Sequence, residues 1–228
     1  MTTAIQSVNE RIISLFGKFQ KLRDAGLTAR LSGMQTFLAS VADHSYLETR
    51  FNLLNLCRVG TDEVKHSAIL AWMLDSTSGH GQGNLFLNAF LKAACIPFDA
   101  GNTRCKVRTE FCVSEAVVDI LVYQRNELLI YVENKVLASE GDSQIDREFR
   151  DMRKMGIGLH VPVSRQYAVF LTPDGWMPSS GDASNWKTLS YTELAQEIQG
   201  VISEGMDSKL RDFIQDWVEA VQTWEVQL

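Results

Sequence analysis

The chain has 228 residues, of which 45% are apolar and 22% carry a charge. These proportions are ordinary for a globular protein and exclude a disordered one, and no apolar run approaches the roughly 20 residues that span a membrane. The net charge of −6 counts against a protein that binds nucleic acid through its overall charge, although residues 1–50 and the group from Arg147 to Arg165 lean basic.

The amino-terminal sequence lacks the basic, apolar and small-residue regions of a secretory signal, so we expect a cytoplasmic protein. The four cysteines form no CxxC pair and the four histidines form no HExxH motif, which excludes the usual structural zinc sites. Unpaired thiols of this kind are typical of a reducing compartment.

Residues 4–24 carry apolar side chains at helical spacing, and from Val8 to Leu22 the steps alternate between four and three residues. A helix of this kind packs on its own domain or pairs with a second copy of the chain, because three heptads make a short coiled-coil seam. A homodimer through this helix is therefore the alternative to packing within one chain. Residues 27–50 show no clear pattern.

Thr61 or Asp62 is expected to cap a helix that runs to about Asp75, with acidic residues in its first turn as the helix dipole favours. A glycine-rich loop over 79–83 and a second helix follow. The loop has no following Lys-Ser/Thr pair and no preceding strand, so it is interpreted as a helix–helix connection rather than a phosphate-binding loop.

After Pro97 the pattern changes to short β-branched segments at 106–113, 116–124 and 128–135, which predict three consecutive strands. The last two have a short connection, Gln124 to Glu127, so we expect an antiparallel hairpin. A helix over about 143–155, a strand over 167–172 and an amphipathic helix from Leu210 to Trp224 complete the order. This order predicts an α/β (α+β) fold: a central mixed β-sheet flanked by helices, with helical additions at both ends.

Three charged side chains stand out in the predicted strands. Asp119 lies in an apolar strand, where a charge is costly unless it is paired or binds a metal. Glu133 and Lys135 are two residues apart and therefore point to the same face of the next strand. If the two strands are neighbours, two carboxylates and an ammonium converge; a Glu-x-Lys pair alone would more often be a surface ion pair.

This grouping suits the hydrolysis of a phosphodiester bond. The carboxylates of Asp119 and Glu133, with the backbone carbonyl of Asn134, offer the oxygen ligands that Mg²⁺ prefers, and Mn²⁺ can substitute for it. Such an ion acidifies a bound water and offsets the charge that develops on the phosphate. Lys135 can orient the water or neutralise the same charge.

Short matches to one known family run in order from about Asn55 to Tyr191. They are Glu63, His66-Ser67, 70–75, 79–83, Phe86-Leu87, Glu110, 118–120, 132–135, Gln144, 171–175 and Ser190-Tyr191. With the charged triad, they make the chain resemble the PD-(D/E)XK nuclease superfamily, in particular its bacterial and phage branch with an E-N-K form of the motif.

The resemblance implies a restriction-endonuclease-like core over 51–200, with 1–50 as an N-terminal helical extension and 201–228 as a C-terminal amphipathic helix packed on the core. It implies Asp119 and Glu133 as metal ligands and Lys135 as the catalytic lysine. It also implies Glu63 as an accessory carboxylate near the metal, and Gln144 as a residue that positions the phosphate or the attacking water. Alternatively, Glu63 is an acid that suits the helix dipole and Gln144 a solvated residue at a helix start.

Two departures from the family pattern bear on function: Val118 replaces the proline that names the family, and 114–117 lack basic and glycine residues. The leading hypothesis is a Mg²⁺-dependent endonuclease acting on nucleic acid, DNA in first place, in phage defence, mobile-element biology or DNA processing. The alternative is a catalytically silent nuclease-fold module that binds other proteins. The net charge and residues 114–117 favour the module, whereas the complete triad favours the enzyme.

Overall fold

A five-stranded mixed sheet forms the centre of the computed structural model, which describes residues 51–112, 116–137 and 144–224. Its strands lie side by side in chain order: β1 (Lys106–Cys112), β2 (Val117–Gln124), β3 (Leu128–Asn134), β4 (Gln166–Thr172) and β5 (Trp186–Ser190). Strand β2 is antiparallel to both of its neighbours, β1 and β3, whereas β3, β4 and β5 run parallel. The predicted mixed sheet and α+β fold are confirmed.

The predicted hairpin between β2 and β3 is also confirmed. Gln124 pairs with Leu128, and Asn126 at the turn has a φ of 65°, a left-handed conformation that asparagine tolerates well. One strand was not predicted separately: β5 has only five residues, WKTLS, which is too short for a clear alternation.

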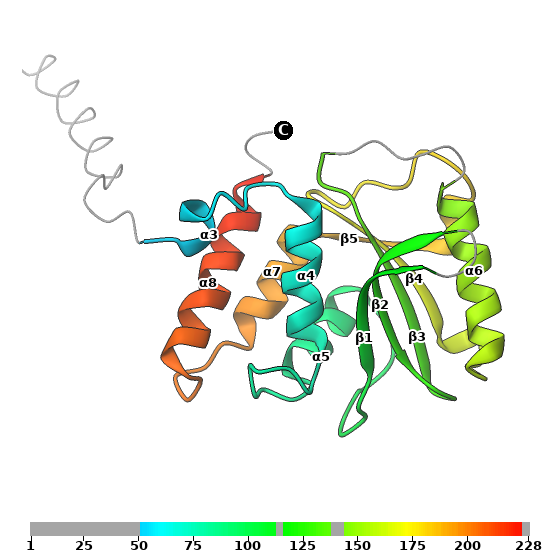
Figure 1. The fold of residues 1–228 in the computed structure, drawn as a ribbon, viewed down its shortest axis with the longest axis horizontal. Helices are drawn as coiled ribbons and strands as arrows, with labels where there is room; N and C mark the ends of the chain where they lie inside the picture. The colour runs from blue at the N-terminus through cyan, green and yellow to red at the C-terminus, as the bar shows by residue number, and fades with distance from the viewer. Residues whose placement is uncertain (1–50, 113–115, 138–143, 225–228) are drawn as a thin grey trace, which may run out of the picture. The chain divides into compact units, whose positions relative to one another are not determined.

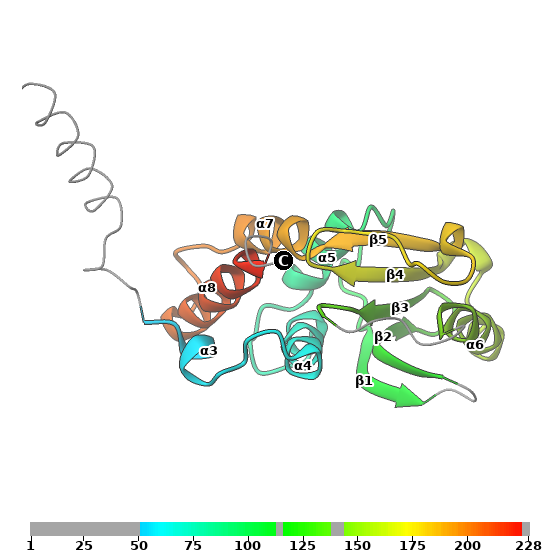
Figure 2. The ribbon, with the colours of Figure 1, turned by 90° about the horizontal axis from the view of Figure 1, so that it is seen from above.

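Helices cover both faces of the sheet (Figures 1 and 2). On one face lie α4 (Glu63–Leu74), α5 (Leu85–Ala93), α7 (Tyr191–Gly200) and α8 (Ser208–Gln222), with the short α3 (Leu53–Leu56) beside α8. On the other face lies α6 alone among the described helices (Gln144–Gly158). Alternate strand residues therefore belong to two hydrophobic cores. Ile130 and Val132 face the larger core, and Leu129 and Tyr131 face α6.

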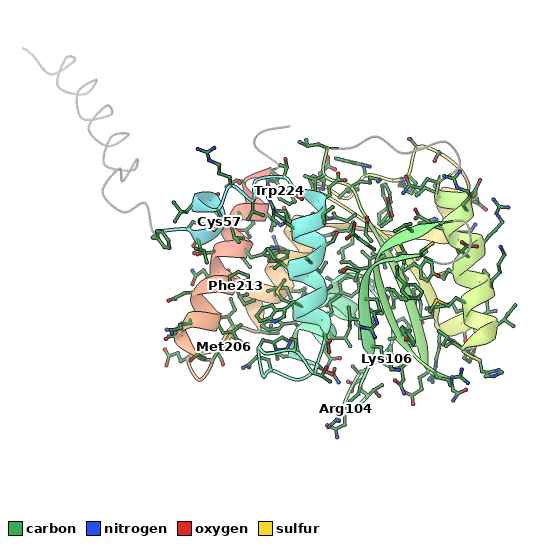
Figure 3. All side chains as sticks on the ribbon, in the orientation of Figure 1. Cys57, Arg104, Lys106, Met206, Phe213 and Trp224 are labelled. Carbon is green, nitrogen blue, oxygen red and sulfur yellow. The ribbon has the colours of Figure 1, made fainter. Side chains whose placement is uncertain are left out.

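The helices on the larger face hold one another through ring contacts. The ring of Trp224, just after α8, packs edge-on against His66 of α4 with centroids 4.6 Å apart, and Phe213 meets Trp72 at 5.6 Å. Trp224 and Phe213 are labelled in Figure 3. As predicted, Asp62 caps α4: its side chain accepts a hydrogen bond from the Lys65 amide. Within the described residues, no helix has the length and apolar character needed to cross a membrane.

The helix predicted over 4–24, with its alternatives of packing within the chain or pairing in a dimer, and the stretch 27–50 lie outside the described residues. The division into 1–50, 51–200 and 201–228 accordingly stays a prediction.

Candidate active site

Asp119, Glu133 and Lys135 meet on the α6 face, where the end of β3 lies beside β2. Lys135 Nζ lies 2.8 Å from Glu133 Oε1, and the Asp119 carboxyl is close enough for its charge to raise the pKa of Glu133, behind the effect of burial. Asp119 Oδ2 accepts a hydrogen bond of 2.7 Å from the Asn134 amide, which fixes the aspartate across the strand pair. The hairpin thus brings the three predicted residues together.

Helix α6 adds two side chains to this group. Gln144, its first residue, donates from Nε2 to Glu133 Oε1 at 2.6 Å and to Glu148 Oε1 at 2.7 Å. The amide therefore bridges two carboxyl groups, one from the sheet and one from the helix. Glu148 is 1% exposed and was not among the predicted residues.

The position of α6 is fixed at two points. Asp151, one turn beyond Glu148, accepts a hydrogen bond of 3.1 Å from the Ala116 amide just before β2. At the other end, Asp146 Oδ1 accepts the Asp182 amide at 2.9 Å. Gly181, in the left-handed region with φ 65°, leaves the room for this contact, because a Cβ there would strike the Asp146 carboxylate. Gln144 and Glu148 consequently stand on an anchored helix.

Glu63 approaches the group from α4, on the opposite side of the sheet's end. Its Oε1 accepts the amides of Val136 and Leu137, at 2.7 and 3.1 Å. The glutamate therefore holds the chain that follows β3, and its charge is close enough to raise the pKa values of Asp119 and Lys135, behind larger causes. A role as accessory metal ligand stays a prediction.

Asn134 points its side chain to the other face. Its Nδ2 donates to the Glu63 carbonyl at 3.1 Å and to Ser67 Oγ at 3.0 Å, and its Oδ1 accepts from the Tyr191 hydroxyl at 2.9 Å. These bonds tie β3 to α4 and α7. The asparagine therefore fixes the position of the end of β3, which carries Glu133 and Lys135, relative to the two helices. Its backbone carbonyl as a ligand stays a prediction.

The carboxyl groups of the site hold protons more tightly than carboxyl groups in water. Burial and the charges of Asp119 and Glu148 raise the pKa of Glu133 well above its usual value. Burial also raises the pKa of Asp119, and it raises the pKa of Glu148 to about 7. Burial disfavours the charged form of Lys135, but the neighbouring carboxylates outweigh it and raise the pKa of the ammonium.

Two oxygens at the centre of the site have no hydrogen-bond donor. No group among the described residues donates to Glu133 Oε2 or Glu148 Oε2, although both atoms are buried. A buried carboxylate oxygen in this position needs a proton or a cation, because loss of its water is otherwise uncompensated. These hard oxygen donors fit a divalent ion in their chemistry.

The same donors are not arranged as a finished metal cage. Among residues 51–112, 116–137 and 144–224, no group of three or more His, Cys, Asp or Glu side chains has the arrangement of a metal site. One reason is that Glu133 Oε1 already accepts from both Lys135 and Gln144.

Comparison with known proteins places this geometry in a family. A family model described as the PD-(D/E)XK nuclease superfamily matches residues 51–219. The chain belongs to the PD-(D/E)XK nuclease superfamily. The match spans the sheet and every helix that contributes to the site, whereas the bacterial and phage branch and the E-N-K form of the motif stay predictions. No curated protein and no solved structure matches the chain.

We expect Val118 to stand at the position of the proline that names the superfamily. Its side chain is 1% exposed and belongs to the core that α6 forms with the sheet. A branched apolar residue fills that place and leaves the following carboxylate of Asp119 in the site, which is a physical reason for the substitution.

Proposed function

We propose that the chain is a Mg²⁺-dependent endonuclease that hydrolyses phosphodiester bonds, with DNA as the substrate. The observation that carries this proposal is the surroundings of Glu133: a 1%-exposed carboxyl with an ammonium and an amide on one oxygen and no donor on the other. Its neighbours Asp119 and Glu148 are acidic as well, so the second oxygen faces a place suited to a cation.

In this proposal Asp119 and Glu133 hold the ion, helped by the Asn134 carbonyl and by Glu63 as an accessory carboxylate. When bound, Mg²⁺ lowers the pKa of a coordinated water and offsets negative charge on the phosphate, and Mn²⁺ supplies the same chemistry. Membership of the superfamily supports this choice, because its nucleases generally use divalent metals.

Lys135 supplies the positive charge of the site. Its side chain is 12% exposed and its Nζ is held by Glu133, so the ammonium has little freedom and still reaches the surface of the site. In this position it stabilises the charge on a phosphate oxygen or orients the attacking water by hydrogen bonding. Gln144 positions the carboxyls of Glu133 and Glu148 relative to each other, and so fixes where the ion and the phosphate meet.

The test is cleavage of supercoiled plasmid, linear duplex, single-stranded DNA and RNA, each with Mg²⁺, with Mn²⁺ and with EDTA. We expect cleavage of DNA that requires the ion and that Glu133→Gln abolishes. The matched control is Glu204→Gln, which removes a carboxylate from an exposed surface position and should leave cleavage unchanged. Cleavage that persists in EDTA, or that survives Glu133→Gln, would contradict the proposal, and cleavage of RNA alone would correct the substrate.

A second candidate is a nuclease-fold module that binds other proteins. The net charge of −6 favours it, because such a protein repels nucleic acid at a distance. Wild-type protein that binds no divalent ion in calorimetry would leave this module as the better account. We propose a cytoplasmic location for either function, which the free thiols of Cys57, Cys95, Cys105 and Cys112 support.

A further inference from the structure

We infer that the edge strand β1 binds the sugar–phosphate backbone of the nucleic acid substrate through Arg104, Lys106 and Arg108, named here the β1 basic row. The inference rests on the proposed nuclease function. It assigns the path along which the substrate backbone leaves the site of Asp119, Glu133 and Glu148. The row has three exposed cations within five residues of a chain whose net charge is −6.

The register of the sheet places Lys106 and Arg108 of the row on the same face as the site. Lys106 pairs with Tyr123 and Arg108 pairs with Leu121, and paired residues of antiparallel strands share a face. Tyr123 and Leu121 both belong to the core on the α6 side. The Lys106 ammonium lies 6.0 Å from the centre of the Tyr123 ring, in agreement with this assignment.

The distance along the sheet suits a bound strand. Along β2, Asp119 is two residues from Leu121, which pairs with Arg108. It is four residues from Tyr123, which pairs with Lys106. At about 3.3 Å per residue, the two cations stand about 7 and 13 Å from Asp119 along the strand direction. A backbone with its reacting phosphate at Asp119 can therefore bring successive phosphates past Arg108 and Lys106.

No described carboxylate forms an ion pair with a cation of the row. Among the described residues, Lys65, Lys92, Lys135 and Lys154 form ion pairs with carboxylates, whereas Arg104, Lys106 and Arg108 form neither an ion pair nor a side-chain hydrogen bond. They border a pocket of about 320 Å³ together with Asp75, Thr77, Cys105 and Val107.

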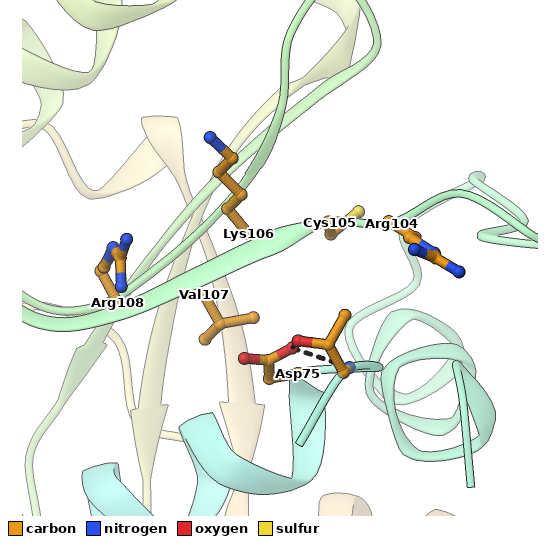
Figure 4. A pocket seen from close by; sticks show the side chains of 7 residues that line it. Asp75, Arg104, Cys105, Lys106, Val107 and Arg108 are labelled. Atoms are coloured by element: carbon orange, nitrogen blue, oxygen red, sulfur yellow. Dashed lines mark hydrogen bonds between the residues drawn. The ribbon is translucent and has the colours of Figure 1, made fainter. Parts of the chain in front are cut away.

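The one acid of that pocket is engaged elsewhere. Asp75 Oδ1 accepts from the amide and the hydroxyl of Thr77, at 2.9 and 2.8 Å. Figure 4 shows Asp75 on the Val107 side of β1, with Lys106 and Arg108 rising from the opposite side. The Asp75 carboxylate therefore lies across the strand from Lys106 and Arg108, and these two cations leave positive charge on their side of β1, which is the property that a phosphate backbone recognises.

Charges on an edge strand also prevent the edges of two sheets from pairing. Reversing the charge separates this structural role from substrate binding, because a glutamate still protects the edge but repels phosphate. The test variant is Lys106→Glu/Arg108→Glu. The matched control is Lys209→Glu/Arg211→Glu, which changes the net charge equally on α8, in the layer on the other face of the sheet.

The measurement is the affinity for labelled duplex and single-stranded DNA, by fluorescence anisotropy in EDTA over a range of salt concentrations. Each lost phosphate contact lowers the slope of log K against log salt by about 0.9 for duplex and about 0.7 for single-stranded DNA. We expect the double variant to lose about 1.8 or about 1.4 of slope, respectively. The control should keep the wild-type slope, and kcat/KM for cleavage with Mg²⁺ should fall only in the β1 variant.

A β1 variant with the slope and kcat/KM of the control would overturn the inference, and wild-type cleavage would then leave the proposed function standing. Wild-type protein that neither binds nor cleaves nucleic acid would overturn both. If the charge reversal prevents folding, as judged by circular dichroism, Lys106→Gln/Arg108→Gln removes the same contacts and should show the same loss of slope.

Discussion

Replacement of Glu148 by glutamine should stabilise the metal-free protein at neutral pH. The buried carboxyls of Glu133 and Glu148 each have an oxygen that no described donor reaches. Glutamine keeps the shape of the side chain, and its oxygen can still accept from Gln144. Its amide nitrogen can donate toward Glu133, so that the substitution supplies the missing donor and removes a buried charge.

The magnitude follows from the proton that Glu148 holds. Burial raises the pKa of Glu148 from its usual 4.5 to about 7. Since one pKa unit corresponds to about 1.4 kcal/mol, protonation of this group favours the folded protein by about 3 kcal/mol. The folded state binds the proton more tightly than the unfolded chain does, so this stability is present below about pH 4.5 and is lost as the pH rises to about 7.

Thermal unfolding in EDTA, followed by circular dichroism, measures the effect. At about pH 8, we expect Glu148→Gln to raise the free energy of unfolding by up to about 3 kcal/mol, or the Tm by about 6–12 °C for a domain of this size. At about pH 5 the gain should be much smaller, because wild-type Glu148 is then mostly protonated. Glu204→Gln on the surface is the control and should change neither value.

A Glu148→Gln protein no more stable than wild type above pH 7 would refute this reasoning, and so would an equal gain at both pH values. In the first case burial of the Glu148 carboxylate would not destabilise the folded protein. In the second case the gain would come from packing or hydrogen bonding alone and not from charge.

Three further predictions address the metal, the lysine and the fold. Asp119→Asn should lose most Mn²⁺ affinity in calorimetry, because an amide offers one neutral oxygen in place of a carboxylate; affinity equal to wild type would remove Asp119 from the ligand set. Lys135→Ala should retain the ion but cleave more slowly by orders of magnitude in a plasmid-nicking assay, and wild-type cleavage would overturn the role given to the lysine. Gly156→Ala should lower the free energy of unfolding by about 1–3 kcal/mol, because its Cβ would strike the side chain of Gln166. Gly158→Ala, whose Cβ would meet nothing within 4 Å, is the control, and an equal loss in both would show that the Gln166 contact is not the cause.

Alternation along single strands was sufficient to predict the hairpin that carries the site. In 116–124 and 128–135 the apolar residues are dense and the connection is short, so antiparallel pairing was the simplest outcome. The pairing then required Asp119 and Glu133 to meet. In β5, by contrast, the strand is short and depends on its parallel neighbour β4, a contact between distant segments that local pattern does not encode.

The contribution of α6 to the site was harder to predict for a different reason. Ile145, Glu148 and Met152 follow one another at helical spacing on the buried side of the helix. An acid within an apolar stripe is the one available signal, but it becomes meaningful only when another element provides the partner. Here the other element is β3, whose Glu133 is joined to Glu148 through the side-chain amide of Gln144. The hydrogen bonds that Glu63 Oε1 accepts from the amides of Val136 and Leu137 span more than 70 residues and had no signal in the sequence.

The distribution of charge answers the objection that an acidic chain is a poor nuclease. Asp119, Glu133 and Glu148 concentrate negative charge where the ion is proposed to bind, and burial limits that charge by holding protons on the carboxyls. A divalent ion that displaces those protons turns the same place from repelling a phosphate to attracting one. Lys106 and Arg108 of the β1 basic row lie on the sheet face along which a nucleic acid strand would leave the carboxylate site. No described carboxylate forms an ion pair with the cations of the row. In this proposal, attraction for nucleic acid depends on the charge along one sheet face and on the ion, so the net charge of the chain is a poor guide to it.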